Sequence, residues 1–236
     1  TVGGVRFYCS LDDSSRKTDS ERLILLKDRN VLENYASVFA AAPPKNILEF
    51  GIFQGGSPAL FSLWFEVEKF VGIDLSPPVP AFDEFCRTHA VGSKIRAYYG
   101  VSQTDHSRIR EVVRTEFGDT PLDVVIDDAS HLYETTRRAF EIAFPLLRRG
   151  GTYVIEDWGW AHWPGSKHFL NETPLSMLIM ELVMLCAAHS EIISEVRVFP
   201  AFAFIRKASQ APDLSDMNLD AWQSKRDIEI VGAKNL

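Results

Sequence analysis

Short apolar runs alternate with longer amphipathic stretches through the middle of the chain. The runs are rich in Val, Ile and aromatic residues and lack polar alternation, as expected for parallel strands buried on both faces. We predict five strands, over Asn46–Phe50, Lys69–Asp74, Lys94–Tyr99, Leu122–Asp127 and Gly151–Glu156. The stretches between them predict four helices, over Ser57–Glu68, Ala81–His89, Asp105–Phe117 and Leu132–Arg148. This alternation is typical of an α/β fold with a doubly wound, mostly parallel sheet.

The two ends of the chain follow different patterns. Ser20–Ala41 has a helical pattern that stops at Pro43 and Pro44, whose rings prevent its continuation. A further helix is expected over Pro174–His189. Two apolar segments follow, Glu195–Phe199 and Phe202–Lys207, and they predict a β-hairpin that adds an antiparallel strand.

We divide the chain into three parts on this basis. They are an N-terminal helical cap (1–45), a core (46–207) and a C-terminal tail (208–236) for which we predict no regular structure.

Composition narrows the class of protein. The 236 residues are 46% hydrophobic and 24% charged, as in an ordinary globular domain, and the net charge of −7 disfavours nucleic-acid binding. No apolar run reaches the roughly 18 residues of a membrane helix, and the N-terminus lacks a signal-peptide pattern. The chain does not begin with Met, so an upstream segment could be missing. Three widely spaced cysteines suggest reduced thiols, and we expect a cytoplasmic enzyme acting on small molecules.

A glycine-rich loop follows the first predicted core strand. That strand ends with Glu49 and Phe50, Gly51 follows directly, and Gly55 precedes a helix that opens with Ser57. Ligands of open α/β sheets bind beside the carboxyl ends of the strands, where a glycine allows a tight turn and close backbone approach. The loop therefore predicts a cofactor site, although a turn that merely packs a helix on a strand would use the same residues.

The spacing of the glycines bears on which cofactor binds. A dinucleotide fingerprint would read Gly-x-Gly-x-x-Gly, whereas this loop reads Gly-x-x-x-Gly-Gly from Gly51. The second strand ends in Asp74, placed to accept hydrogen bonds from ribose hydroxyls.

These residues resemble the first two motifs of the class I S-adenosylmethionine (SAM)-dependent methyltransferases. The resemblance rests on Glu49, Gly51, Gly55 and Asp74 and covers roughly residues 46–207. It implies SAM as cofactor and a Rossmann-like sheet of seven strands with the last strand antiparallel. It also suggests a homo-oligomer.

By the same resemblance, the adenine would lie near the polar loop after the third strand. Ser102 and Gln103 are the candidate contacts there. Asp105, in the same loop, is equally well explained as a helix N-cap.

Carboxylates gather at the ends of the fourth and fifth strands. Asp127, Asp128 and His131 follow the fourth strand, and Glu156 and Asp157 end the fifth. Unpaired carboxylates packed closely repel one another, and a bound cation removes that conflict. Oxygen ligands select hard ions such as Mg²⁺, which would orient a hydroxyl and lower its pKa. The pKa of a histidine suits a general base near neutrality.

The sequence Asp-Asp-x-Ser-His, followed by Ile-Glu-Asp-x-Trp, narrows the resemblance. It is similar to the metal-dependent O-methyltransferases of the macrocin and mycinamicin type and to their cephalosporin-hydroxylase-type relatives. The similarity implies that Asp128, Glu156 and Asp157 bind Mg²⁺ and that His131 deprotonates the acceptor hydroxyl. Asp127 is a candidate cofactor contact. Two alternatives stay open, namely Asp128 as a helix cap and Glu156 as the partner of an arginine.

The resulting hypothesis is methyl transfer from SAM to a hydroxyl of a small glycosylated or polyhydroxylated natural product. Trp158, Trp160 and Trp163 could stack on that acceptor or close a lid over the core. A catechol or phenol acceptor and a non-catalytic cofactor-binding protein of the same fold are the alternatives. A nicotinamide-dependent oxidoreductase is disfavoured by the glycine spacing.

Overall fold

A seven-stranded sheet forms the centre of the computed structural model, which describes residues 1–10, 14–163 and 172–222. Its strands are β3 (Asn46–Phe50), β4 (Lys69–Asp74), β5 (Ile95–Tyr99), β6 (Leu122–Asp127), β7 (Leu147–Glu156), β8 (Ile193–Val198) and β9 (Phe202–Lys207). They lie in the order β5-β4-β3-β6-β7-β9-β8. The first five are parallel, and β9 is antiparallel to both β7 and β8. The predicted fold class is confirmed.

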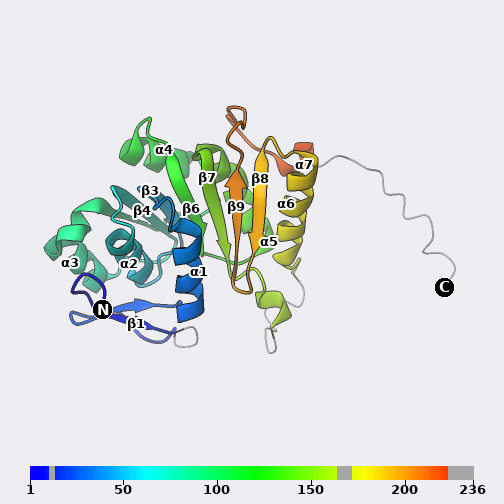
Figure 1. The fold of residues 1–236 in the computed structure, drawn as a ribbon. Coiled ribbons are helices and arrows are strands. Elements are labelled where there is room, and N and C mark those ends of the chain that lie inside the picture. The colour runs from blue at the N-terminus through cyan, green and yellow to red at the C-terminus, as the bar shows by residue number, and fades with distance from the viewer. Residues whose placement is uncertain (11–13, 164–171, 223–236) are drawn as a thin grey trace.

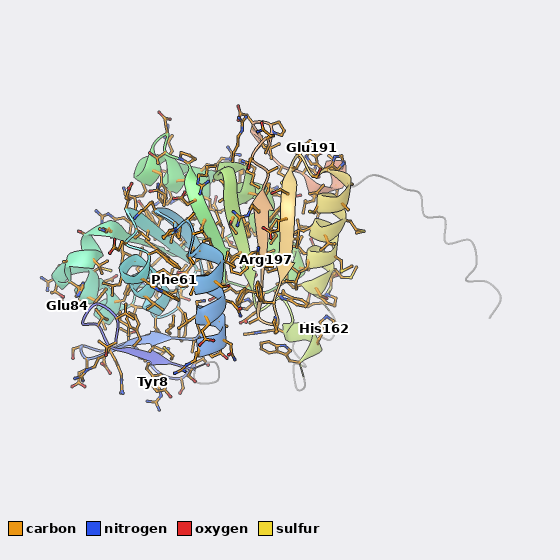
Figure 2. The ribbon with its side chains drawn as sticks, viewed as in Figure 1. Tyr8, Phe61, Glu84, His162, Glu191 and Arg197 are labelled. Carbon is orange, nitrogen blue, oxygen red and sulfur yellow. The ribbon has the colours of Figure 1, made fainter. Side chains whose placement is uncertain are left out.

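Helices cover both faces of the sheet (Figure 1). They are α1 (Arg29–Phe39), α2 (Gly56–Trp64), α3 (Pro80–Thr88), α4 (His106–Phe117), α5 (Tyr133–Ala143), α6 (Ser176–Ala188) and α7 (Leu219–Trp222), with 3₁₀ turns η1 (Ala90–Lys94), η2 (Phe144–Leu146) and η3 (Trp160–His162). Alternate strand residues serve the two faces: Ile47 packs with α1–α3, and Leu48 packs with α4–α6. Phe61 of α2 is fully buried in the first of these layers (Figure 2). None of the described helices is long and apolar enough to cross a membrane.

The N-terminal segment corrects one prediction. Two short parallel strands, β1 (Phe7–Cys9) and β2 (Leu23–Leu25), precede α1, so the helix predicted over Ser20–Ala41 is wrong in its first part. The apolar run of β2 is buried on every residue, which an amphipathic surface helix does not allow. The helix begins only after Asp28, whose Oδ1 accepts a hydrogen bond from the Val31 amide at 2.8 Å.

The β1–β2 pair lies at the carboxyl ends of the central strands (Figure 1). A Cβ atom on Gly56 would lie 2.1 Å from the carbonyl oxygen of Ile24 in β2, so only glycine fits where the two segments meet. This packing places the residues after β2 over the end of the sheet where the glycine loop lies.

The helix predicted over Leu132–Arg148 is also too long. Helix α5 ends at Ala143, and β7 begins at Leu147, which pairs with Leu122 of β6. Pro145 explains the break, because its ring cannot continue a helix. In the tail, α7 forms where no structure was predicted, and Leu219 anchors it by burial. Residues 223–236 lie outside the described part of the chain.

Candidate active site

A cavity of about 560 Å³ opens at the carboxyl ends of β3, β4 and β6. The glycine loop after β3, the loops after β6 and β7, and the segment after β2 form its walls. Gly51, Ser57, Asp74, Ser102 and Gln103 all line it. The structure therefore brings together most of the residues that the sequence assigned to a cofactor.

Steric contacts explain the glycines of the loop. Gly51 has φ 82°, and a Cβ there would lie 2.2 Å from the carbonyl oxygen of Asp128. Gly55 has φ 80°, and a Cβ there would lie 2.2 Å from the ring of Phe82. Both positions require the left-handed region and a close approach, so a side chain is excluded twice over.

Asp74 holds the loop in place. Its Oδ2 accepts hydrogen bonds from the amides of Ile52 at 2.8 Å and Phe53 at 2.9 Å, and its Oδ1 accepts one from the Ser76 amide at 2.7 Å. Phe53 has φ 47°, a strained conformation that this carboxylate stabilises. Asp74 therefore orders the cofactor loop as well as lining the cavity.

Glu49 is buried beneath the loop rather than among the residues that line the cavity. Its Oε2 accepts a hydrogen bond from the Ser57 hydroxyl at 2.8 Å, and its Oε1 has no hydrogen-bond partner within the described part of the chain. Burial raises the pKa of Glu49 well above its usual range. These contacts support Glu49 as a residue that shapes the loop from below.

Asp127 is buried and is not among the residues that line the cavity. It accepts hydrogen bonds from the Gln103 amide at 3.1 Å and from the Tyr153 hydroxyl at 3.0 Å. The side-chain carbonyl of Gln103 in turn accepts a hydrogen bond from the Ser130 backbone amide at 3.1 Å. Burial raises the pKa of Asp127 to about 7. Through these hydrogen bonds Asp127 and Gln103 link the loop after β5 to the loop after β6, and the predicted cofactor contact of Asp127 stays a prediction.

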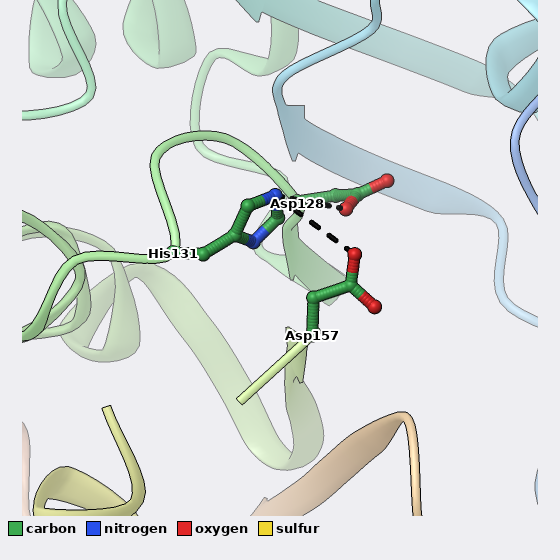
Figure 3. Close-up of side chains that lie close together, drawn as sticks. All are labelled: Asp128, His131 and Asp157. Atoms are coloured by element: carbon green, nitrogen blue, oxygen red, sulfur yellow. Dashed lines mark ion pairs between the residues drawn. The ribbon is translucent and has the colours of Figure 1, made fainter. Parts of the chain in front are cut away.

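Asp128, His131 and Asp157 converge on the cavity (Figure 3). The His131 Nε2 atom lies 3.9 Å from Asp128 Oδ1 and 4.0 Å from Asp157 Oδ2. One ligand atom of each residue falls within 4.8 Å of the others, so the three could share one cation. Their carboxylate oxygens suit a hard ion such as Mg²⁺.

Electrostatics and backbone strain both concentrate in this cluster. Burial lowers the pKa of His131 to about 4, so its imidazole is neutral near pH 7. Burial and the neighbouring Asp128 and Glu156 raise the pKa of Asp157 to about 8, a conflict that a bound cation would relieve. His131 and Asp157 have φ of 55° and 51°, and backbone strain of this kind is characteristic of functional sites.

Two residues of this site were not predicted from the sequence. The Lys27 Nζ donates to Asp128 Oδ2 at 2.8 Å and to Glu156 Oε2 at 2.6 Å, and the Tyr35 hydroxyl donates to Glu156 Oε1 at 2.6 Å. Glu156 thus lies beside the cluster with both oxygens already bonded, and its role as a metal ligand stays a prediction. The only sequence signal for Lys27 is its place directly after an apolar run.

The tryptophan loop serves two purposes. The Trp158 indole donates to the Phe199 carbonyl at 2.8 Å and so ties the loop to the segment before β9. Trp160 and Trp163 line the cavity, and the Trp160 ring lies 4.5 Å from the His131 ring between centroids. Stacking on an acceptor and closure of a lid over the core both stay predictions for this loop.

Comparisons with known proteins agree with this geometry. Residues 48–158 match the family model described as a methyltransferase domain. The demethylmacrocin O-methyltransferase of Streptomyces fradiae is 34% identical over 126 residues, which are 50% of this chain and 29% of that protein. The mycinamicin VI 2''-O-methyltransferase of Micromonospora griseorubida is 32% identical over 126 residues, 50% of this chain and 28% of that protein.

Solved structures extend the similarity beyond the matched segment. The mycinamycin-pathway MycE methyltransferase, in complex with Mg, SAH and mycinamycin VI, is 26% identical with a TM-score of 0.59, covering 75% of this chain and 49% of that one. A putative caffeoyl-CoA O-methyltransferase from Staphylococcus aureus, 17% identical with a TM-score of 0.55 over 77% of this chain and 84% of that one, shares the fold. The chain spans under a third of the curated relatives' length and about half of MycE. Residues 48–158 thus match a methyltransferase domain, and the chain is similar over half of its length to the macrocin and mycinamicin sugar O-methyltransferases.

Proposed function

We propose that this protein transfers a methyl group from SAM to a hydroxyl of a small glycosylated or polyhydroxylated natural product. The observation that carries the proposal is the convergence of Asp128, His131 and Asp157 on the cavity that the glycine loop also lines. The sugar O-methyltransferases similar to this chain, and the Mg and SAH bound to MycE, support the choice of donor, metal and acceptor class.

The residues divide the work between donor and acceptor. The glycine loop at Gly51, which Asp74 holds in place through two backbone amides, would bind SAM. Ser102 would lie near the adenine. Asp128 and Asp157 would hold Mg²⁺, which supplies a positive charge that orients the acceptor hydroxyl and lowers its pKa.

His131 would then accept the hydroxyl proton on Nε2, because its neutral imidazole has a free lone pair near pH 7. The acceptor oxygen attacks the methyl carbon as the carbon–sulfur bond breaks. The products are the methyl ether and S-adenosylhomocysteine.

The same proposal covers the organisation of the chain. Residues 46–207 would be the SAM-binding core, with 1–45 as a cap and 208–236 as a tail. Val31 and Tyr35 of α1 pack in the same apolar layer as α2, which supports a cap that completes the core. A cytoplasmic location and a homo-oligomeric state belong to the proposal as well.

Substitution of His131 by Ala tests the mechanism. We expect His131→Ala to lower the rate of SAH formation by about 10²-fold or more, because a positioned general base contributes that much. The affinity for SAH, measured by calorimetry, should be unchanged. The acceptor probes are glycosylated polyketides with free sugar hydroxyls, and catechol for the phenolic alternative. EDTA should remove activity and added Mg²⁺ should restore it.

His106→Ala is the matched control, since His106 lies on α4 outside the cavity. A normal methylation rate in His131→Ala, or in EDTA-treated protein, would contradict the mechanism. Binding of NAD in place of SAM would favour an oxidoreductase. SAM binding without turnover of either acceptor class would favour a non-catalytic protein.

A further inference from the structure

Lys27 is a buried cation inside the acidic cluster. Its side chain is only 2% exposed, and its ammonium forms ion pairs of 2.8 Å with Asp128 and 2.6 Å with Glu156. It comes from the segment after β2, 101 residues from Asp128 and 129 from Glu156 along the chain. A lysine buried with two carboxylate partners is a built arrangement rather than a chance surface contact.

The cluster holds more carboxyl groups than one ammonium can pair with. The Lys27 ammonium interacts electrostatically with Asp128, Glu156 and the buried Glu49, and also with Asp157. The Asp128 carboxylate is shared between two sides. Its Oδ2 is bonded to Lys27, whereas its Oδ1 faces His131 and Asp157, where the candidate cation position lies.

A divalent cation held by Asp128 and Asp157 would therefore share a carboxylate with the ammonium. Like charges so close together in a buried site repel one another strongly. Glu156, the third acidic residue at this end of the sheet, has one oxygen bonded to Lys27 and the other to Tyr35. The ammonium thus neutralises part of the negative charge that would otherwise attract a metal ion.

We propose that Lys27 is a built-in cation that competes with the divalent metal for Asp128 and Glu156 and so sets the metal affinity of the site. This inference rests on the metal site of the proposed function. Lys27 is a positioning residue in this scheme: it keeps the acidic cluster assembled and charge-balanced without metal, at the cost of weaker metal binding.

The test is the affinity of the full-length chain for Mn²⁺, followed by calorimetry and by the EPR signal of free Mn²⁺. Lys27→Met keeps an unbranched side chain, one atom shorter, and removes its charge. We expect Lys27→Met to bind Mn²⁺ about tenfold or more tightly than the wild-type protein, because the repulsion between the two cations is gone. Structural damage would weaken binding, so a gain in affinity is a readout that a merely structural role would not produce.

Tyr35→Phe is the matched control, because it frees the other oxygen of Glu156 without changing the charge. It should leave Mn²⁺ affinity unchanged. Lys27→Gln is the second variant if Lys27→Met does not fold, since a neutral amide can still donate to both carboxylates. SAH binding reports whether each variant is folded.

Three results would overturn the inference: equal or weaker Mn²⁺ binding in both Lys27 variants, equal tightening in Tyr35→Phe, or no Mn²⁺ binding in any protein. Tighter binding in a Lys27 variant, including binding seen there alone, supports it. The proposed function fails separately. If neither the wild-type protein nor a variant binds Mn²⁺, its metal site is refuted, and if SAH does not bind to the folded wild-type protein, its cofactor is refuted.

Discussion

Two buried lysines lie at opposite ends of the sheet and have opposite surroundings. Lys27 and Lys207 are 2% and 4% exposed. The Lys27 ammonium lies at the carboxyl end of β7, between Asp128 and Glu156, whereas the Lys207 ammonium donates to the carbonyls of Pro145 and Leu147, at the start of β7. One ammonium pairs with carboxylates, whereas the other donates its hydrogen bonds to backbone carbonyls.

The difference shows that neighbouring charges decide whether burial lowers the pKa of a lysine. Burial disfavours the ammonium in both cases. At Lys207 burial prevails and lowers the pKa of the side chain to about 8. At Lys27 the opposing burial is outweighed by Asp128 and Glu156, which raise its pKa above the ordinary value. One end of the sheet therefore holds a lysine that stays charged within an acidic site. The other end holds a lysine whose hydrogen bonds stabilise the start of β7.

Removal of each charge gives the largest expected difference. Lys27→Met should lower the free energy of unfolding of the metal-free protein by ~3–5 kcal/mol, because it leaves buried carboxylates without their cation. Lys207→Met should cost less, about 1–3 kcal/mol, because it leaves only carbonyls without a donor. Urea unfolding at pH 7.5 in EDTA measures both.

Mn²⁺ should recover part of the loss in Lys27→Met and none in Lys207→Met. Equal losses of stability in the two variants, or no recovery by Mn²⁺, would show that the two lysines stabilise the fold in the same way. The contrast between them would then be wrong.

The sequence predicts most strands of the sheet and the acidic residues at their ends, but neither buried lysine. Strands β3, β4, β6 and β9 have their predicted bounds because strands buried on both faces are mostly apolar runs bounded by turn residues. The same pattern places Asp74, Asp128 and Asp157 at one edge, since parallel strands share their carboxyl ends. The position of the cavity therefore follows from the strand topology, which the apolar pattern of the sequence predicts.

Lys27 could not be found in this way. Its segment pairs with β1 and lies over distant strand ends, so its partners are set by tertiary contacts that no local pattern records. Gly56, in contact with Ile24, shows the same dependence on long-range packing. The hydrogen bonds of Asp127 with Gln103 and Tyr153 were equally hidden, because they join residues 24 and 26 positions apart along the chain.

The pH dependence of stability gives a smaller effect at Lys207. A lysine whose pKa is lowered in the folded state binds fewer protons there than when unfolded, between pH 8 and the ordinary value of 10.5. Stability rises with pH wherever the unfolded state binds more protons. The wild-type protein should therefore gain up to about 2 kcal/mol relative to Lys207→Met between pH 8 and 9.5.

Urea unfolding of both proteins across that range measures the difference, and other titrating groups cancel in the subtraction. A difference that shrinks as pH rises would mean that the Lys207 ammonium is stabilised by its carbonyls, and the contrast with Lys27 would then be lost.

The smallest effect is expected at the exposed edge of the sheet, where Glu195 on β8 meets Arg197 and Arg206 (Figure 2 labels Arg197). The Glu195 side chain is 39% exposed, so water and salt screen these pairs. We expect Glu195→Gln to change the free energy of unfolding by ~0–1 kcal/mol in low salt, and by less in high salt. A larger, salt-independent loss would mean that ion pairs here stabilise as strongly as those around Lys27. Both lysines are buried and Glu195 is not. In that case burial would not explain why some ion pairs of this protein are strong and others weak.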